Sequence, residues 1–97
     1  MRGALAAALL AFAIARPAIA EVAVVDGLGR TVRLVAPAKR ILTLAPSITE
    51  AAFAVGAGAR VAGASAWSDF PPEAARLPVV SSSAGIDFET VAKLAPD

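Results

Sequence analysis

The chain has 97 residues, of which 58% are hydrophobic and 18% are charged, and its formal net charge is +1. It contains no histidine, cysteine or tyrosine, and so lacks the commonest general base, the thiol nucleophile and the phenolic acid. We therefore predict no catalytic residues, no disulfide and no nitrogen- or sulfur-ligated metal site, and the nearly balanced charge gives no basic surface for nucleic acid.

The N-terminus has the pattern of a cleaved secretory signal. Arg2 precedes an uncharged apolar stretch over 4–15, and Arg16 and a proline then lead to a small-residue tripeptide ending at Ala20. A membrane anchor is the alternative, but a spanning helix needs about 20 apolar residues. We predict a signal peptide over 1–20, cleavage after Ala20 and export to the periplasm as a soluble protein.

A glycine-rich segment between two short apolar runs comes next. Val22–Val25 and Thr31–Leu34 flank Asp26–Arg30, which is the pattern of a β-hairpin. The Gly-x-Gly of this segment has neither the third glycine nor the following helix of a dinucleotide-binding loop, so it favours a turn. We assign the hairpin and its connector to 21–38, and an α/β lobe to 39–97.

An apolar strand that passes directly into a helix is the most informative unit of the chain. The run over 41–44 is typical of a buried parallel strand, and Pro46 ends it. Ser47 and Glu50 have the spacing of a capping box, which predicts that Ser47 caps the helix. Gly56 is expected to end the helix in the left-handed conformation.

A second apolar strand, Val61–Ser65, follows this helix and predicts a parallel strand-helix-strand unit with a right-handed crossover. Val79-Val80 is expected to be a third parallel strand. In open α/β sheets, ligands bind beyond the carboxyl ends of the strands. The predicted ligand edge therefore combines 45–47, 65–67 and a serine-rich loop over 81–85.

Five residues of this edge are candidate ligand contacts. Trp67 is the first, because a flat ring suits a flat ligand, although a tryptophan more often fills a core. Pro46 and Ser65 lie where strands end. Ser47 stands at a helix N-terminus, which attracts anions, but capping its own helix is the alternative role. Ser83 lies in a loop that either hydrogen-bonds amide or carboxylate groups or is only solvated.

The C-terminal part predicts a short helical turn and a second helix. Pro72 suits the first residue of a turn that ends at Arg76, and Phe70 before it is expected to pack. Asp87 is expected to cap a helix over 88–94, with Glu89 favourably placed in its first turn. Three apolar side chains of this helix are expected to face inward: Phe88, Val91 and Leu94.

In this order, these elements resemble the start of the periplasmic substrate-binding proteins that feed cobalamin and iron-siderophore ABC importers. The shared pattern is a basic residue before a strand, Ala-Pro-Ser-x-Thr-Glu over 45–50, Gly-Ala-Gly over 56–58 and Asp-Phe-Pro-Pro-Glu-Ala over 69–74. The resemblance implies the class III architecture of two α/β lobes joined by a long helix. The predicted fold class is α/β: the N-terminal part of a Rossmann-like lobe with parallel strands and an N-terminal β-hairpin, the lobe being incomplete in this chain.

The resemblance also implies a function. The protein would capture cobalamin in the periplasm and deliver it to a membrane permease, as a monomer that is not an enzyme and has no cofactor. In cobalamin-binding relatives an aromatic residue at the position of Trp67 packs against the corrin, whereas Ser83 replaces a second aromatic residue. A glutamate at the place of Glu89 docks on an arginine of the permease. A ferric siderophore or haem is the alternative ligand, and an envelope scaffold without a small ligand is the alternative of another class.

Overall fold

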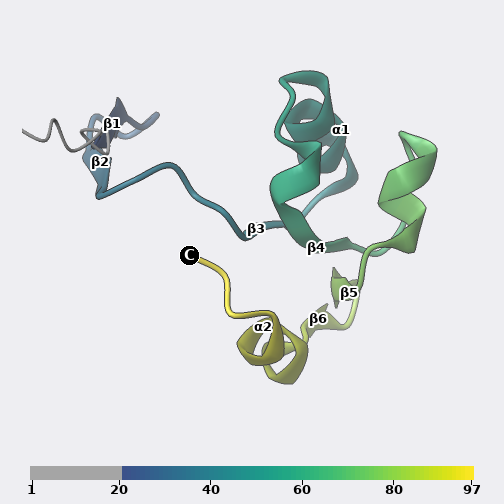
Figure 1. Cartoon of the computed structure of the whole chain (residues 1–97). Helices are drawn as coiled ribbons and strands as arrows, with labels where there is room; N and C mark the ends of the chain where they lie inside the picture. The colour runs from purple at the N-terminus through teal and green to yellow at the C-terminus, as the bar shows by residue number, and fades with distance from the viewer. Residues whose placement is uncertain (1–20) are drawn as a thin grey trace, which may run out of the picture. The chain divides into compact units, whose positions relative to one another are not determined.

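The computed structural model describes residues 21–97, so the predicted signal peptide and its cleavage site lie outside the described part. The chain divides into two compact units, one ending at Ala36 and the other spanning Pro37–Asp97. We describe each unit by itself (Figure 1). Among the described residues, no helix combines the length and apolar character needed to cross a membrane.

The first unit is the predicted β-hairpin. Strand β1 (Val22–Val25) pairs antiparallel with β2 (Thr31–Leu34). Asp26 closes the turn, because its Oδ1 accepts 2.9 Å hydrogen bonds from the backbone N–H groups of Leu28 and Arg30. The Arg30 bond is the main reason that the pKa of Asp26 lies below its ordinary value. The prediction of a turn here is confirmed.

The second unit contains a four-stranded sheet in the order β3-β4-β5-β6. Strands β3 (Ile41–Thr43), β4 (Val61–Ser65) and β5 (Val79–Ser82) are parallel, which confirms the predicted strand-helix-strand unit and the third parallel strand. Helices α1 (Pro46–Ala54) and α2 (Phe88–Leu94) lie on opposite sides of this sheet (Figure 1).

A fourth strand replaces part of the expected serine-rich loop. Strand β6 (Gly85–Ile86) turns back antiparallel to β5, with Ser82 paired to Gly85 and Ser81 to Ile86. Gly85 takes a φ of +111°, which a residue with a side chain rarely adopts. The expectation of a loop over 81–85 is therefore wrong in its extent, since only two residues form the tip of a tight hairpin.

The start of α1 differs from its prediction. Ala45 is the N-cap residue, with extended backbone angles, and no side chain caps the helix. Proline lacks an N–H group and has a fixed φ, so Pro46 can take the first helical position. The helix therefore begins two residues earlier than expected and Ser47 lies inside its first turn. The predicted capping box of Ser47 and Glu50 is wrong, whereas the predicted left-handed glycine at Gly56 is confirmed by its φ of +85°.

Two short 3₁₀ turns complete the second unit. One (Gly58–Arg60) leads into β4, and the other (Pro72–Arg76) is the predicted turn that begins at Pro72. The predicted cap of α2 is also confirmed, because Asp87 Oδ1 accepts a 3.1 Å hydrogen bond from the Thr90 N–H. Bonds from the Thr90 hydroxyl and N–H lower the pKa of Asp87.

The inward-facing residues of α2 are only partly those predicted. Val91 and Leu94 are half-buried, but Phe88 is 75% exposed. Phe88 is the first residue of the helix, whereas Leu94, in the last turn, is the residue that approaches the sheet. The ring of Phe88 therefore stays in solvent. Phe70, expected to pack, is exposed as well.

The core of the second unit is small and partly polar. Its largest fully buried side chains are those of Val80, Thr43 and Thr49. On the side of α2 the packing is tight: a Cβ added at Gly63 would lie 2.7 Å from Val80 Cγ1 and 2.8 Å from Leu94 Cδ1. Strand β4 therefore has no room for a side chain at this position.

Candidate functional site

The carboxyl ends of β3, β4 and β5 meet at one edge of the sheet, where they surround a hollow of about 220 Å³. Three loops that are far apart in the sequence come together there, as the parallel topology requires. The hollow is lined by Leu44, Ala45, Pro46, Ser65, Ala66, Trp67, Ser81, Ser82 and Ser83.

Four of the five predicted contact residues line this hollow: Pro46, Ser65, Trp67 and Ser83. Ser47 does not, since it is an exposed residue inside the first turn of α1. The hydroxyl of Ser65 is hydrogen-bonded within the protein, 2.9 Å from that of Ser68, and is less available to a ligand than that of Ser83.

Trp67 has two unusual properties. Its side chain is 86% exposed although it is large and apolar. Its φ is +67°, a left-handed value that is uncommon for a bulky residue. Trp67 follows Ala66 in a turn that is closed by a 3.3 Å hydrogen bond from Ser68 N to Ser65 O. A residue at this place in a turn takes a positive φ in the type II geometry, which ordinarily selects glycine or asparagine.

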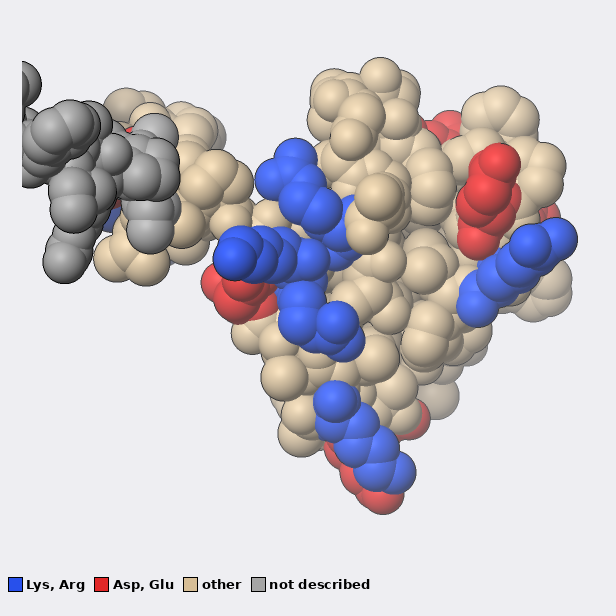
Figure 2. Space-filling model, viewed as in Figure 1, with Lys and Arg blue, Asp and Glu red and all other residues tan. Residues whose placement is uncertain are grey.

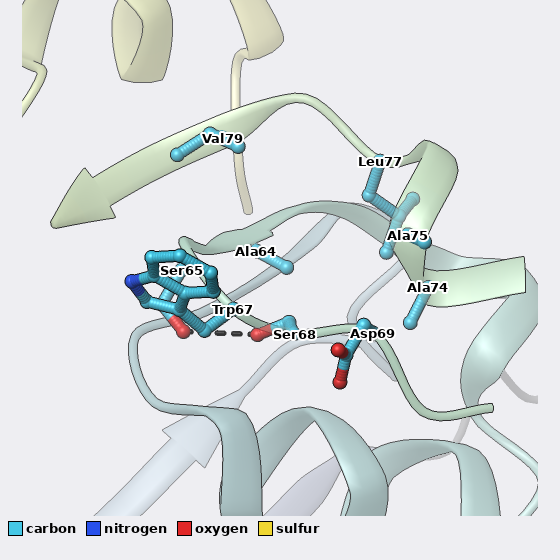
Figure 3. A pocket seen from close by; sticks show the side chains of 9 residues that line it. All are labelled: Ala64, Ser65, Trp67, Ser68, Asp69, Ala74, Ala75, Leu77 and Val79. Atoms are coloured by element: carbon cyan, nitrogen blue, oxygen red, sulfur yellow. Dashed lines mark hydrogen bonds between the residues drawn. The ribbon is translucent and has the colours of Figure 1, made fainter. Parts of the chain in front are cut away.

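A second hollow of about 220 Å³ shares Ser65 and Trp67 with the first (Figure 3). The 3₁₀ turn over 72–76 contributes to it, and Asp69 brings a carboxylate. Ser65 and Trp67 were predicted as ligand contacts, whereas Asp69 and the residues of this turn were not. The hollow is lined by Ala64, Ser65, Trp67, Ser68, Asp69, Ala74, Ala75, Leu77 and Val79.

Beneath the turn lies a cluster of four buried hydroxyl groups, which we call the hydroxyl cluster: Thr43, Thr49, Ser65 and Ser68. The Thr49 hydroxyl is 2.7 Å from that of Thr43 and 2.9 Å from that of Ser68, and it also donates to Ala45 O at 3.2 Å. The cluster joins β3, α1 and the turn that carries Trp67. In the sequence, the one indication of this cluster is Thr43, a polar residue at the end of an apolar strand.

One serine of the hollow has an unused hydroxyl. The Oγ of Ser81 is buried and has no hydrogen-bond partner within residues 21–97. Buried hydroxyl groups are usually paired, because an unpaired one loses its bonds to water without replacement. Ser81 lines the hollow, but its Oγ is not exposed in it.

Glu89 lies away from the hollow, in the first turn of α2. Its side chain is 81% exposed and forms a 3.1 Å ion pair with Lys93, one turn further along the helix. The two charges largely neutralise each other on this surface.

The ends of the second unit are joined by polar contacts. Asp97 Oδ1 accepts hydrogen bonds from the backbone N–H groups of Lys39 (2.9 Å) and Arg40 (2.8 Å), and Arg40 Nε donates to Leu94 O at 2.6 Å. The bond from Arg40 is the main reason that the pKa of Asp97 is lowered. In Figure 2 several basic side chains gather on one side of this unit, next to an acidic group.

Comparison with known proteins agrees with the sequence pattern. No family model matches the chain. The vitamin B12-binding protein of Pectobacterium carotovorum is 48% identical over 59 residues, which are 61% of this chain and 21% of the relative. That of Vibrio cholerae is 43% identical over 61 residues, or 63% of this chain and 22% of the relative.

A solved structure extends this similarity to the fold. The crystal structure of the periplasmic vitamin B12 binding protein BtuF of Vibrio cholerae matches with a TM-score of 0.61 and 43% identity, over 63% of this chain and 24% of that chain. The matched segment is homologous to vitamin B12-binding proteins. The predicted resemblance and the predicted α/β fold class are therefore confirmed. The chain spans about a fifth of the length of the vitamin B12-binding relatives.

Proposed function

We propose that this chain belongs to the substrate-binding component of an ABC importer, which captures cobalamin in the periplasm and delivers it to a membrane permease. The observation that carries this proposal is the exposed ring of Trp67 at the carboxyl edge of the sheet, within a unit homologous to vitamin B12-binding proteins. These relatives are named for binding vitamin B12, which supports a binding protein and not an enzyme, with cobalamin as its cargo. That the protein has no cofactor of its own is part of the proposal.

The chemistry of the edge suits a corrinoid. A corrin is a broad, mostly flat ring with amide side chains, so it needs an apolar surface for the ring and hydrogen-bonding groups around it. Trp67 offers the apolar surface, and an indole packs well against a flat ring. The hydroxyl of Ser83 can bond the amides; Ser81 also lines the hollow, but its Oγ is buried.

A ferric siderophore or haem is the second candidate ligand. The observation that favours it is the run of Ser81, Ser82 and Ser83 in the lining of the hollow, which holds no aromatic ring besides that of Trp67. A polar wall suits the oxygen-rich surface of a siderophore as well as it suits the amides of a corrin.

Glu89 is our candidate for docking on the permease. It is exposed on α2, away from the hollow, and can therefore meet a partner while the ligand is bound. Its ion pair with Lys93 must open or be shared when an arginine of the permease approaches. Exposed pairs contribute little to stability, so this exchange costs little.

We also propose export to the periplasm as a monomer, after cleavage of a signal peptide following Ala20. The support is the N-terminal sequence pattern and the periplasmic relative. Sequencing the N-terminus of exported protein tests it: Glu21 as the first residue is expected, and Met1 would contradict it.

The ligand is tested by calorimetric titration of the protein in its full natural length with cyanocobalamin, a ferric siderophore and haem. We expect saturable binding of cyanocobalamin, and weaker binding in Trp67→Ala. Phe88→Ala is the matched control, because Phe88 is an aromatic residue of similar exposure outside the hollow. Binding of an iron chelate alone would move the protein to the second candidate, and binding of none would favour an envelope scaffold.

A further inference from the structure

We infer that Thr49 and Ser68 are positioning residues for Trp67: their buried hydroxyls hold the turn over 65–68 in the conformation that presents the indole to the ligand. The inference rests on the proposed function for its ligand readout, but not for its structural readout. It concerns residues that have no contact with the first hollow, since neither lines it.

The conformation of Trp67 needs an explanation outside its own side chain. Its φ of +67° belongs to a region that residues with a side chain rarely adopt, and such outliers persist only where the surroundings enforce them. The indole is 86% exposed, so burial of the ring does not compensate for the backbone. The enforcing contacts therefore lie at the neighbouring residues of the turn.

The neighbours of Trp67 are anchored on both sides. The Ala66 N–H donates to Ser81 O at 2.7 Å, which fastens the turn to β5. Ser65 and Ser68 are each 7% exposed, and their hydroxyls bond to each other across the turn at 2.9 Å. Figure 3 shows this bond next to the indole of Trp67, which takes no part in it.

Thr49 connects this turn to the end of the segment that precedes α1. Its hydroxyl has three partners, Ser68, Thr43 and the carbonyl of Ala45, which match the one donor and two acceptor positions of a hydroxyl group. Ala45 lines the hollow, as Trp67 does. One buried hydroxyl thus bonds to the backbone of Ala45 and to the turn that carries Trp67, and sets their relative position.

The test uses variants that separate the hydroxyl groups from the packing of the side chains. Thr49→Val removes it in a side chain of the same shape, Thr49→Ser keeps it, and Ser68→Ala removes the partner in the turn. The protein in its full natural length is labelled with 5-fluorotryptophan, and the ¹⁹F resonance of Trp67 is assigned by its loss in Trp67→Phe. Without ligand, we expect a shifted or broadened resonance in Thr49→Val and Ser68→Ala, and a native one in Thr49→Ser.

The affinity for cyanocobalamin gives the second readout. We expect it to fall about tenfold in Thr49→Val, the size expected when a buried hydrogen-bonding group loses its partner. Trp67→Ala should remove most of this effect, so that Thr49→Val changes the affinity little in that background. Thr49→Ser should bind like the natural protein.

Leu94→Ala is the control for a general loss of stability, because Leu94 packs on the opposite side of the sheet near Gly63. It should lower the stability and leave the Trp67 resonance unchanged. An unchanged resonance in Thr49→Val and Ser68→Ala, or an equal change in Leu94→Ala, would overturn the inference. If the natural protein binds no cyanocobalamin, the proposed function fails, while the ¹⁹F comparison still decides whether Thr49 and Ser68 position Trp67.

Discussion

The two sides of the sheet in the second unit are held by different forces. On the side of α2, aliphatic side chains pack on Gly63, so that β4 lies close to Val80 and Leu94. On the side of α1, near the carboxyl edge, the buried groups are the hydroxyl cluster and its hydrogen bonds. Close packing limits volume but tolerates small rotations, whereas hydrogen bonds also fix direction.

This difference agrees with the roles proposed for the two sides of the sheet. The side of α2 carries no proposed ligand contact, so its side chains need only to pack without cavities. The carboxyl edge must hold an exposed ring in a strained backbone conformation, and directional bonds are suited to that task. The comparison therefore predicts large effects of volume changes on one side, and combined effects on stability and binding on the other.

The largest expected effect is that of Gly63→Val on stability. The new Cβ would lie 2.7 Å from Val80 Cγ1 and its methyl groups would displace Leu94 and Leu42, so we expect a loss of about 3 kcal/mol in the free energy of unfolding. Urea denaturation measures it. Gly27→Ala is the control, because a Cβ at Gly27 meets nothing within 4 Å; equal losses in both variants would show that β4 is not tightly packed.

Thr49→Val should have the next largest effect. It preserves the shape of the side chain but leaves Thr43 and Ser68 without their shared partner, and we expect a loss of about 2 kcal/mol. The same denaturation experiment measures it. Thr31→Val, at an exposed position of β2, should be nearly neutral. A stability of Thr49→Val equal to that of the natural protein would mean that the hydroxyls add no net stability.

Trp67→Gly and Trp67→Ala separate strain from binding. Both remove the indole and should bind cyanocobalamin poorly. Glycine accepts a φ of +67° without strain, so Trp67→Gly should be about 1 kcal/mol more stable than Trp67→Ala. Thermal unfolding of both variants measures the difference, and a less stable glycine variant would argue that the backbone at Trp67 is relaxed.

Asp97 links the ends of the unit in a way that depends on pH. Hydrogen bonds from Arg40 and Lys39 lower its pKa below the ordinary 3.8. A carboxylate with a lowered pKa in the folded state stabilises the fold above its unfolded pKa, and the contribution is lost as the pH falls through the folded value. Asp97→Asn should therefore reduce stability at neutral pH, by an amount that shrinks below about pH 3.8. Denaturation at a series of pH values tests this; a pH-independent difference would contradict it.

Glu89→Arg should have the smallest effect on the fold. The exposed pair with Lys93 contributes less than about 1 kcal/mol. Ligand affinity should stay unchanged while transport by the importer falls, and Glu73→Arg, on the 3₁₀ turn over 72–76, is the control for the added charge. Normal transport by Glu89→Arg would remove the docking proposal.

The local elements follow from the sequence alone. Alternating and apolar runs predict β1, β2, β3 and β4, because a strand's pattern is written in adjacent residues. The cap at Asp87 and the left-handed Gly56 likewise depend on residues within one turn of a helix. The order of these elements was sufficient to predict the parallel sheet and the edge at which Pro46, Ser65, Trp67 and Ser83 meet.

The contacts of these residues, in contrast, depend on how the whole unit folds. Whether Ser47 or Ala45 is the N-cap residue of α1 depends on whether Pro46 is part of the helix. The exposure of Phe88 depends on which turn of α2 contacts the sheet. The hydroxyl cluster joins Thr43, Thr49 and Ser68 from three separate segments, so no local sequence pattern predicts the hydrogen bonds between them. The backbone strain at Trp67 is of the same kind, since a sequence favours ordinary angles and only contacts made by the rest of the fold enforce others.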